Sequence, residues 1–121
     1  MQDRVSECPI EGAMVLLSGR WRALIIYYLS RGPMRFNALR RANTGISHQM
    51  LTRELRALET AGVIVRTAFS GPSPHVEYAL TARGEHLIPI IDALGDWFEA
   101  APVMPAPGSP TAGGEPAVTP A

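Results

Sequence analysis

The middle of the chain contains two helical patterns, over residues 35–42 and 48–61, separated by a short turn at Gly45. Ser47 is a suitable N-cap for the second segment, and Gly62 is a suitable stop after it. Apolar residues in the second segment recur at steps of four and three, which predicts one buried helix face: Leu51, Leu55 and Leu58. Two short helices joined by a glycine-containing turn are typical of a helix-turn-helix.

Further helices are predicted on both sides of this motif. Residues 9–17 and 20–30 are expected to be helical, with Cys8 as the N-cap of the first. A last helix is expected over residues 82–100, with a kink at Pro89 because proline cannot donate a helical hydrogen bond. In the helix over 20–30, the stripe expected to be buried comprises Trp21, Leu24, Ile25, Tyr28 and Leu29.

A β-hairpin is predicted between the helix-turn-helix and the last helix. Residues 63–69 are rich in β-branched side chains, and residues 75–80 alternate apolar and polar ones, so the two segments are expected to pair. The loop over 70–74 would form the tip. This order of elements predicts a mainly α fold with a small β-hairpin, which is a winged helix-turn-helix.

A change of composition near residue 100 divides the chain. Residues 101–121 hold six of the eleven prolines, a single charged residue and no aromatic residue, so a disordered tail rich in Pro, Ala and Gly is expected. Residues 1–100 would form one domain. No run approaches the ~18 apolar residues of a membrane span, and a single cysteine excludes a disulfide within the chain. We therefore expect a cytoplasmic protein with no membrane partner.

The formal charges cancel over the chain, but they are separated along it. Residues 35–66 hold six Arg and two Glu, a net charge of +4, whereas residues 77–99 hold one Arg and five acidic residues, a net charge of −4. A basic middle and an acidic end make a polarised domain. Solvated helix faces would account for such a pattern, but the basic residues coincide with the helix-turn-helix, which favours DNA binding.

The face of the second helix opposite the leucines carries polar and basic side chains at helical spacing: His48, Gln49, Thr52, Arg53 and Arg56. Arg can bind O6 and N7 of guanine, Gln can pair with adenine, and the Thr methyl group can contact thymine. We assign Gln49, Thr52 and Arg53 to base edges, and Arg56 and Ser47 to phosphates. The alternative is a hydrophilic helix surface without a ligand, which the helix-turn-helix spacing disfavours.

The helix before the turn is expected to cross the phosphate backbone of the DNA. Three cations assigned to this helix would set the position of the protein without reading sequence: Arg35, Arg40 and Arg41. The hairpin tip would reach toward the adjacent minor groove. Because the segment from Ser70 to His75 carries only His75 and no arginine, we expect a weak contact there.

The terminal helices carry more apolar surface than the core needs. The last helix has a stripe that ends in Trp97 and Phe98, and the first helix is short and apolar. Pairing these helices across a two-fold axis would bury the excess, so we expect a homodimer that forms through the terminal helices. The alternative is that the last helix packs only on its own hairpin. In the dimer, two recognition helices would address half-sites about 34–36 Å apart.

Several motifs occur in the order found in one known family: Cys8-Pro9, Gly19-Arg20-Trp21, Gly32-Pro33-Met34-Arg35-Phe36, Gly45-Ile46-Ser47 and Pro74-His75-Val76-Glu77-Tyr78. Over most of its folded part the chain resembles the HxlR-type (MarR-related) winged-helix transcriptional regulators. The resemblance implies a homodimer that binds a pseudo-palindromic operator and regulates neighbouring genes, in some members in response to electrophiles or oxidants. The family often has a basic residue before Val-Glu-Tyr, where this chain has His75.

Cys8 has two interpretations. A thiol at a helix cap lies near unpaired backbone N–H groups, which favour the thiolate form. The resemblance implies that some members use the cysteine at this place as a redox or electrophile sensor. The alternative is a small buried apolar residue.

No pattern indicates an enzyme, a metal site or a cofactor. The three histidines, His48, His75 and His86, are scattered without an acid or a cysteine at ligand spacing. No nucleophile–base pair and no Gly-rich phosphate loop occurs. The sequence therefore predicts a transcriptional regulator, expected to be a repressor, that binds a double-stranded DNA operator as a homodimer. The alternative is a winged helix that binds proteins and not DNA.

Overall fold

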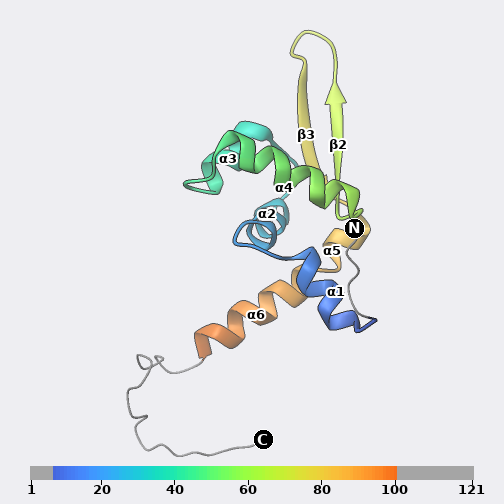
Figure 1. Ribbon diagram of the computed structural model, residues 1–121. Coiled ribbons are helices and arrows are strands. Elements are labelled where there is room, and N and C mark those ends of the chain that lie inside the picture. The colour runs from blue at the N-terminus through green and yellow to red at the C-terminus, as the bar shows by residue number, and fades with distance from the viewer. Residues whose placement is uncertain (1–6, 101–121) are drawn as a thin grey trace, which may run out of the picture.

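The computed structural model describes residues 7–100, so the predicted tail over 101–121 lies outside the described residues, as do residues 1–6. The elements are α1 (Pro9–Leu16), α2 (Arg22–Leu29), β1 (Met34–Arg35), α3 (Phe36–Ala42), α4 (His48–Thr60), β2 (Ile64–Phe69), β3 (His75–Leu80), α5 (Ala82–Glu85) and α6 (Ile88–Ala100). In Figure 1 the helix-turn-helix of α3 and α4 and the wing of β2 and β3 lie at one end of the molecule, while α1 and α6 lie at the other.

The sheet has three antiparallel strands in the order β1-β3-β2. The predicted hairpin of β2 and β3 is confirmed, with pairing along the whole of both strands. The sequence does not predict β1, in which Met34 and Arg35 pair with Tyr78 and Glu77. Two residues are too few to display the alternation by which a strand is recognised. β1 joins the wing to the start of α3 and so fixes the wing beside the helix-turn-helix.

The hydrophobic core surrounds α2, which contacts α3, α4, α6 and β3. The three leucines predicted on α4 are buried, and they pack with Ile25, Ile26 and Leu29 of α2. The predicted stripe of α2 is wrong at two positions, because Ile26 is fully buried and Leu24 is exposed. An apolar helix with neighbours on several sides does not reveal from its sequence which side stays in solvent.

The predicted single helix over 82–100 is divided into α5 and α6. Pro89 is the second residue of α6, and the interruption falls at residues 86 and 87. A proline within a continuous helix would clash with the carbonyl group four residues earlier, here that of Glu85. The chain avoids this clash by ending α5 at Glu85 and starting a new helix at which proline is tolerated.

α5 packs directly on the backbone that leads into β2. Gly84 is buried, and a Cβ atom added there would lie 2.2 Å from the carbonyl oxygen of Val63. The Thr81 hydroxyl caps α5 by accepting the Gly84 N–H, and it donates to the carbonyl of Gly62 at 2.6 Å. These contacts hold the end of β3 against the end of α4.

α1 and α6 leave many large apolar side chains exposed: Ile10, Met14, Val15, Ile90, Leu94, Trp97 and Phe98. Neither helix has a fully buried residue. The surplus apolar surface expected at the two terminal helices is therefore present at the end of the molecule opposite the wing (Figure 1). None of the described helices has the length and apolar character needed to span a bilayer.

Candidate nucleic-acid interface

α4 is an amphipathic helix with its polar face turned to solvent. Five side chains on that face line one shallow hollow, which we call the α4 strip: His48, Gln49, Thr52, Arg53 and Arg56. All are exposed except Thr52, which is half-buried. The structure thus brings together every residue that the sequence predicts for this face of the helix.

The start of α4 is fixed by its cap and by the preceding turn. The Ser47 hydroxyl accepts the Met50 N–H at 3.0 Å, which makes Ser47 the predicted N-cap. Ile46 is buried beside it and anchors the turn in the core. Gly45 has φ +95°, a backbone conformation that side chains with a Cβ atom rarely adopt. These residues set the direction in which α4 leaves the core.

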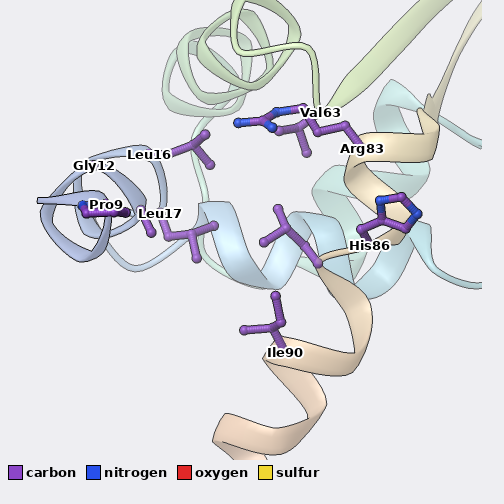
Figure 2. Close-up of a pocket in the computed structure, with 10 residues that line it drawn as sticks. Pro9, Gly12, Leu16, Leu17, Val63, Arg83, His86 and Ile90 are labelled. Carbon is purple, nitrogen blue, oxygen red and sulfur yellow. The ribbon is translucent and has the colours of Figure 1, made fainter. Parts of the chain in front are cut away.

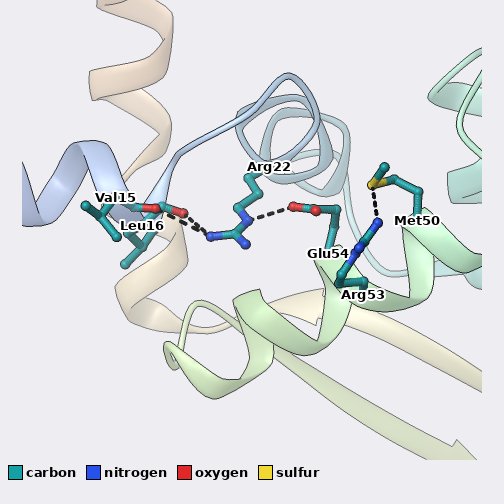
Figure 3. Close-up of polar contacts among 6 residues, drawn as sticks. All are labelled: Val15, Leu16, Arg22, Met50, Arg53 and Glu54. Carbon is teal, nitrogen blue, oxygen red and sulfur yellow. Dashed lines mark hydrogen bonds and ion pairs between the residues drawn. The ribbon is translucent and has the colours of Figure 1, made fainter. Parts of the chain in front are cut away.

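Local contacts decide which groups of the α4 strip remain available. The Thr52 hydroxyl donates to the His48 carbonyl at 2.9 Å, and this bond occupies its proton. A guanidinium nitrogen of Arg53 lies 3.2 Å from the Met50 sulfur, a weak contact that orients the side chain along the helix (Figure 3). Gln49 and Arg56 make no side-chain hydrogen bond to any described residue. The strip therefore offers one amide and two guanidinium groups to a ligand.

The predicted phosphate-binding cations lie beside the strip. Arg40 and Arg41 are on α3, and with Ser47 they line a hollow that adjoins the turn. The Arg40 Nε donates to the Ile46 carbonyl at 3.4 Å, so this arginine also supports the turn. Arg35 lies in β1, immediately before α3 and not on it, and it shares a second hollow with Arg41 and His75.

The wing holds its histidine through internal contacts. His75 Nδ1 lies 2.8 Å from the Ser73 carbonyl, and Nε2 lies 3.0 Å from the Glu77 carboxylate. The imidazole ring also stacks on Phe69, with ring centroids 4.9 Å apart. The two ring nitrogens and one ring face of His75 are therefore engaged within the wing.

An ion pair that sequence reasoning missed connects α4 to the rest of the domain. The Arg22 Nε donates to the Glu54 carboxylate at 2.6 Å, and the same guanidinium donates to the Leu16 carbonyl at 3.1 Å (Figure 3). Both side chains are largely buried. Arg22 therefore joins the end of α1 to α4, and it neutralises the acid closest to the α4 strip.

Cys8 is exposed at the N-cap position of α1, so its interpretation as a buried apolar residue is wrong. His86 lies on the turn after α5, whereas His48 begins α4 and His75 begins β3. Among residues 7–100 no three His, Cys, Asp or Glu side chains are grouped so as to hold a metal ion.

Comparisons with known proteins agree with this fold. The model of the HxlR-like helix-turn-helix family matches residues 16–103. An uncharacterized HTH-type transcriptional regulator of Methanothermobacter thermautotrophicus is 41% identical over 90 residues, which cover 74% of this chain and 69% of the relative. A solved MarR-family regulator from Porphyromonas gingivalis W83 is 36% identical with a TM-score of 0.74, over 83% of this chain and 98% of that one.

The solved redox regulator HypR in its reduced form is similar as well. It is 35% identical with a TM-score of 0.73, and the match covers 77% of this chain and 92% of that chain. The helix-turn-helix, the wing and the terminal helices of this chain thus correspond to an arrangement that regulators of transcription share.

Proposed function

The chain belongs to the HxlR-like helix-turn-helix family of transcriptional regulators, and we propose that it represses transcription by binding a pseudo-palindromic DNA operator as a homodimer. The exposed α4 strip carries the proposal, because it presents amide and guanidinium groups on a helix of the width that a major groove accepts. In this proposal the protein is located in the cytoplasm, where it binds chromosomal DNA.

In this proposal three residues of the α4 strip read sequence, and the polar side chains around them bind phosphates. Gln49 and Arg53 bind base edges, and the methyl group of Thr52 contacts thymine, since its hydroxyl is already bonded to the helix backbone. Arg56 of the strip and four exposed side chains beside it bind phosphates and set the docking position: Arg35, Arg40, Arg41 and Ser47. The His48 ring lies tilted against Phe36 at the start of α4, beside the same groove.

The homodimer forms through α1 and α6. Their exposed apolar side chains lie at the end of the molecule opposite the wing, so pairing them leaves α4 of each subunit facing outward. A two-fold axis then places the two α4 helices in successive major grooves, about 34–36 Å apart along the DNA. An operator with inverted half-sites follows from this symmetry.

The test is footprinting of the purified protein on genomic DNA, followed by titration of a protected fragment at several salt concentrations. We expect protected inverted repeats and an affinity that falls steeply with salt, because each phosphate contact releases counterions. An absence of protected sites would favour the alternative, a winged helix that binds only proteins. Loss of affinity in Arg53→Ala, with affinity retained in the charge-matched Arg83→Ala on α5, would assign the binding to the α4 strip.

A second part of the proposal concerns Cys8, and it is supported by the exposure of the thiol and by the similarity to the redox regulator HypR. The Cys8 thiolate adds to a ring carbon of a quinone, so that an S–C bond forms as a C=C π bond breaks. The electron pair moves to a quinone oxygen, which takes a proton from solvent. The adduct then alters operator affinity. A Cys8→Ser variant should keep its operator affinity and lose the response to quinone; an unchanged response in this variant would rule out Cys8 as the sensor.

A further inference from the structure

Arg22 connects three helices through one guanidinium group. It is the first residue of α2, and its Nε donates to the Glu54 carboxylate on α4 at 2.6 Å. Its Nη1 donates at 3.1 Å to the carbonyl of Leu16, the last residue of α1. A planar guanidinium presents its N–H groups in a fixed fork, so it holds its two acceptors in a set geometry. Arg22 therefore fixes the end of α1 relative to the middle of α4 (Figure 3).

α1 packs loosely on the rest of its own domain. None of its residues is fully buried, and a cavity of about 530 Å³ lies between α1 and the α5–α6 segment (Figure 2). The last turn of α1 carries no basic residue, so Arg22 supplies the positive charge that favours the carbonyl end of a helix. The Arg22 bridge is therefore an important part of what holds α1 in place.

Burial makes this bridge difficult to open. The side chains of Arg22 and Glu54 are only 22% and 14% exposed. Opposite charges that are withdrawn from water attract each other more strongly, and salt screens them less, than charges at the surface. Separation of the pair would leave both charges poorly solvated and without a partner. We therefore expect α1 and α4 to keep one relative position in the folded protein.

We propose that Arg22 is a positioning residue for DNA recognition, and that it sets the separation of the two α4 helices in the homodimer. α1 carries part of the apolar surface assigned to the dimer, including Ile10 and Met14. A rigid link from this surface to α4 fixes where each α4 lies relative to the two-fold axis. One added base pair moves a half-site about 3.4 Å along the DNA and about 35° around it, so a rigid dimer rejects the altered spacing. This role rests on the proposed DNA-binding function.

The link is tested first without DNA, by amide hydrogen exchange of the full-length protein measured with mass spectrometry. Glu54→Gln keeps the shape of the side chain and removes its charge. We expect the amides of α1 to exchange severalfold faster in this variant, because the guanidinium is no longer held in place and releases the Leu16 carbonyl. Glu59→Gln, at an exposed position of the same helix, is the control and should exchange as the unaltered protein does. Unchanged exchange of α1 in Glu54→Gln would overturn the link.

The effect on recognition is tested with operator fragments found by footprinting, in which the two half-sites are moved apart or together by one base pair. We expect the unaltered protein and Glu59→Gln to bind the altered spacings at least about tenfold more weakly, a difference worth roughly 1.4 kcal/mol. In Glu54→Gln this penalty should shrink severalfold, while the base preference within each half-site stays the same. An ion pair that only stabilises the fold would weaken binding to all spacings alike. That result, or equal binding of all spacings by the unaltered protein, would overturn the role of Arg22.

A second variant separates positioning from folding defects. Arg22→Met combined with Glu54→Gln removes both charges, so neither is left buried without a partner. This double variant, once circular dichroism shows that it is folded, should also tolerate the altered spacings. Strict spacing in the folded double variant would overturn the proposal. If the unaltered protein binds no operator at all, the proposed function fails, and with it the role in spacing, whereas hydrogen exchange still decides whether Arg22 links α1 to α4.

Discussion

The arginine side chains of this domain fall into two groups: those whose guanidinium group already binds another residue, and those whose guanidinium group does not. Arg22 is engaged by Glu54 and by the end of α1, and Arg40 donates to the turn before α4. Arg56 has no such partner among residues 7–100. A count of basic residues therefore overstates the charge available to a ligand, and the position of each head group decides its role.

Replacement of Arg53 by Ala should affect one base pair of the operator more than the rest. We expect a loss of ~1–3 kcal/mol at that position, because a bidentate contact to guanine is removed. The measurement is the affinity of Arg53→Ala for operators substituted at each position in turn. Base preference that stays the same as in the unaltered protein would contradict the assignment of Arg53 to a base edge.

Replacement of Arg41 by Ala should weaken binding to all DNA sequences alike. The expected signature is a salt slope reduced by about one, since one phosphate contact is lost. Affinity for operator and for unrelated DNA, each measured over a range of salt, tests this. A selective loss on the operator alone would instead make Arg41 a reader of sequence.

Replacement of Gly84 by Ala should destabilise the domain, although alanine is the better helix former. The added Cβ atom would meet the Val63 carbonyl oxygen, so the α5 backbone must move, at a cost of about 1–3 kcal/mol. Urea denaturation followed by circular dichroism measures the free energy of unfolding. Gly12→Ala on α1 is the matched control, because nothing lies within 4 Å of its added Cβ atom; it should be neutral or slightly stabilising.

At the level of secondary-structure elements, strong local signals predict the bounds of α4 to within one residue. The leucine stripe, the Ser47 cap and Gly62 are local signals that lie within α4 or next to one of its ends. β3 is predicted without error for the same reason, since its alternation spans six residues. The errors arise where the deciding contact is distant: β1 exists because β3 pairs with it, and the exposed side of α2 depends on what packs around it.

The candidate site also combines features that have a local sequence signal with features that depend on distant contacts. The α4 strip is predictable because its residues share one helix face, whereas the Arg22–Glu54 ion pair joins residues 32 positions apart and has no local pattern. Contacts of this kind require the tertiary structure.

The N-cap of α4 provides a prediction at this scale. Ser47→Ala should lower the free energy of unfolding by about 1 kcal/mol, because the Met50 N–H loses its acceptor. Ser70→Ala is the control, since Ser70 is exposed in the hairpin loop and its hydroxyl makes no hydrogen bond to a described residue. Thermal melts of both variants make the comparison, and equal stability of the two would mean that the turn alone holds the start of α4.

For the molecule as a whole, the assembly proposed through α1 and α6 is open to a direct test. Trp97 is 71% exposed, so Trp97→Glu should leave the subunit folded and place charge in an apolar interface. We expect the variant to sediment as a monomer and to lose most of its operator affinity. Glu99→Gln, also exposed on α6, is the control. A Trp97→Glu protein that remains dimeric would move the interface to another surface.

The engagement of His75 within the wing has a consequence for the genes that such a protein controls. If the hairpin contributes little to recognition, specificity is confined to the few base pairs that face each α4. Bases that flank those half-sites can then change during evolution without loss of binding by the regulator. We expect the promoters bound by this regulator to share two short inverted half-site sequences and to differ in most of the flanking sequence.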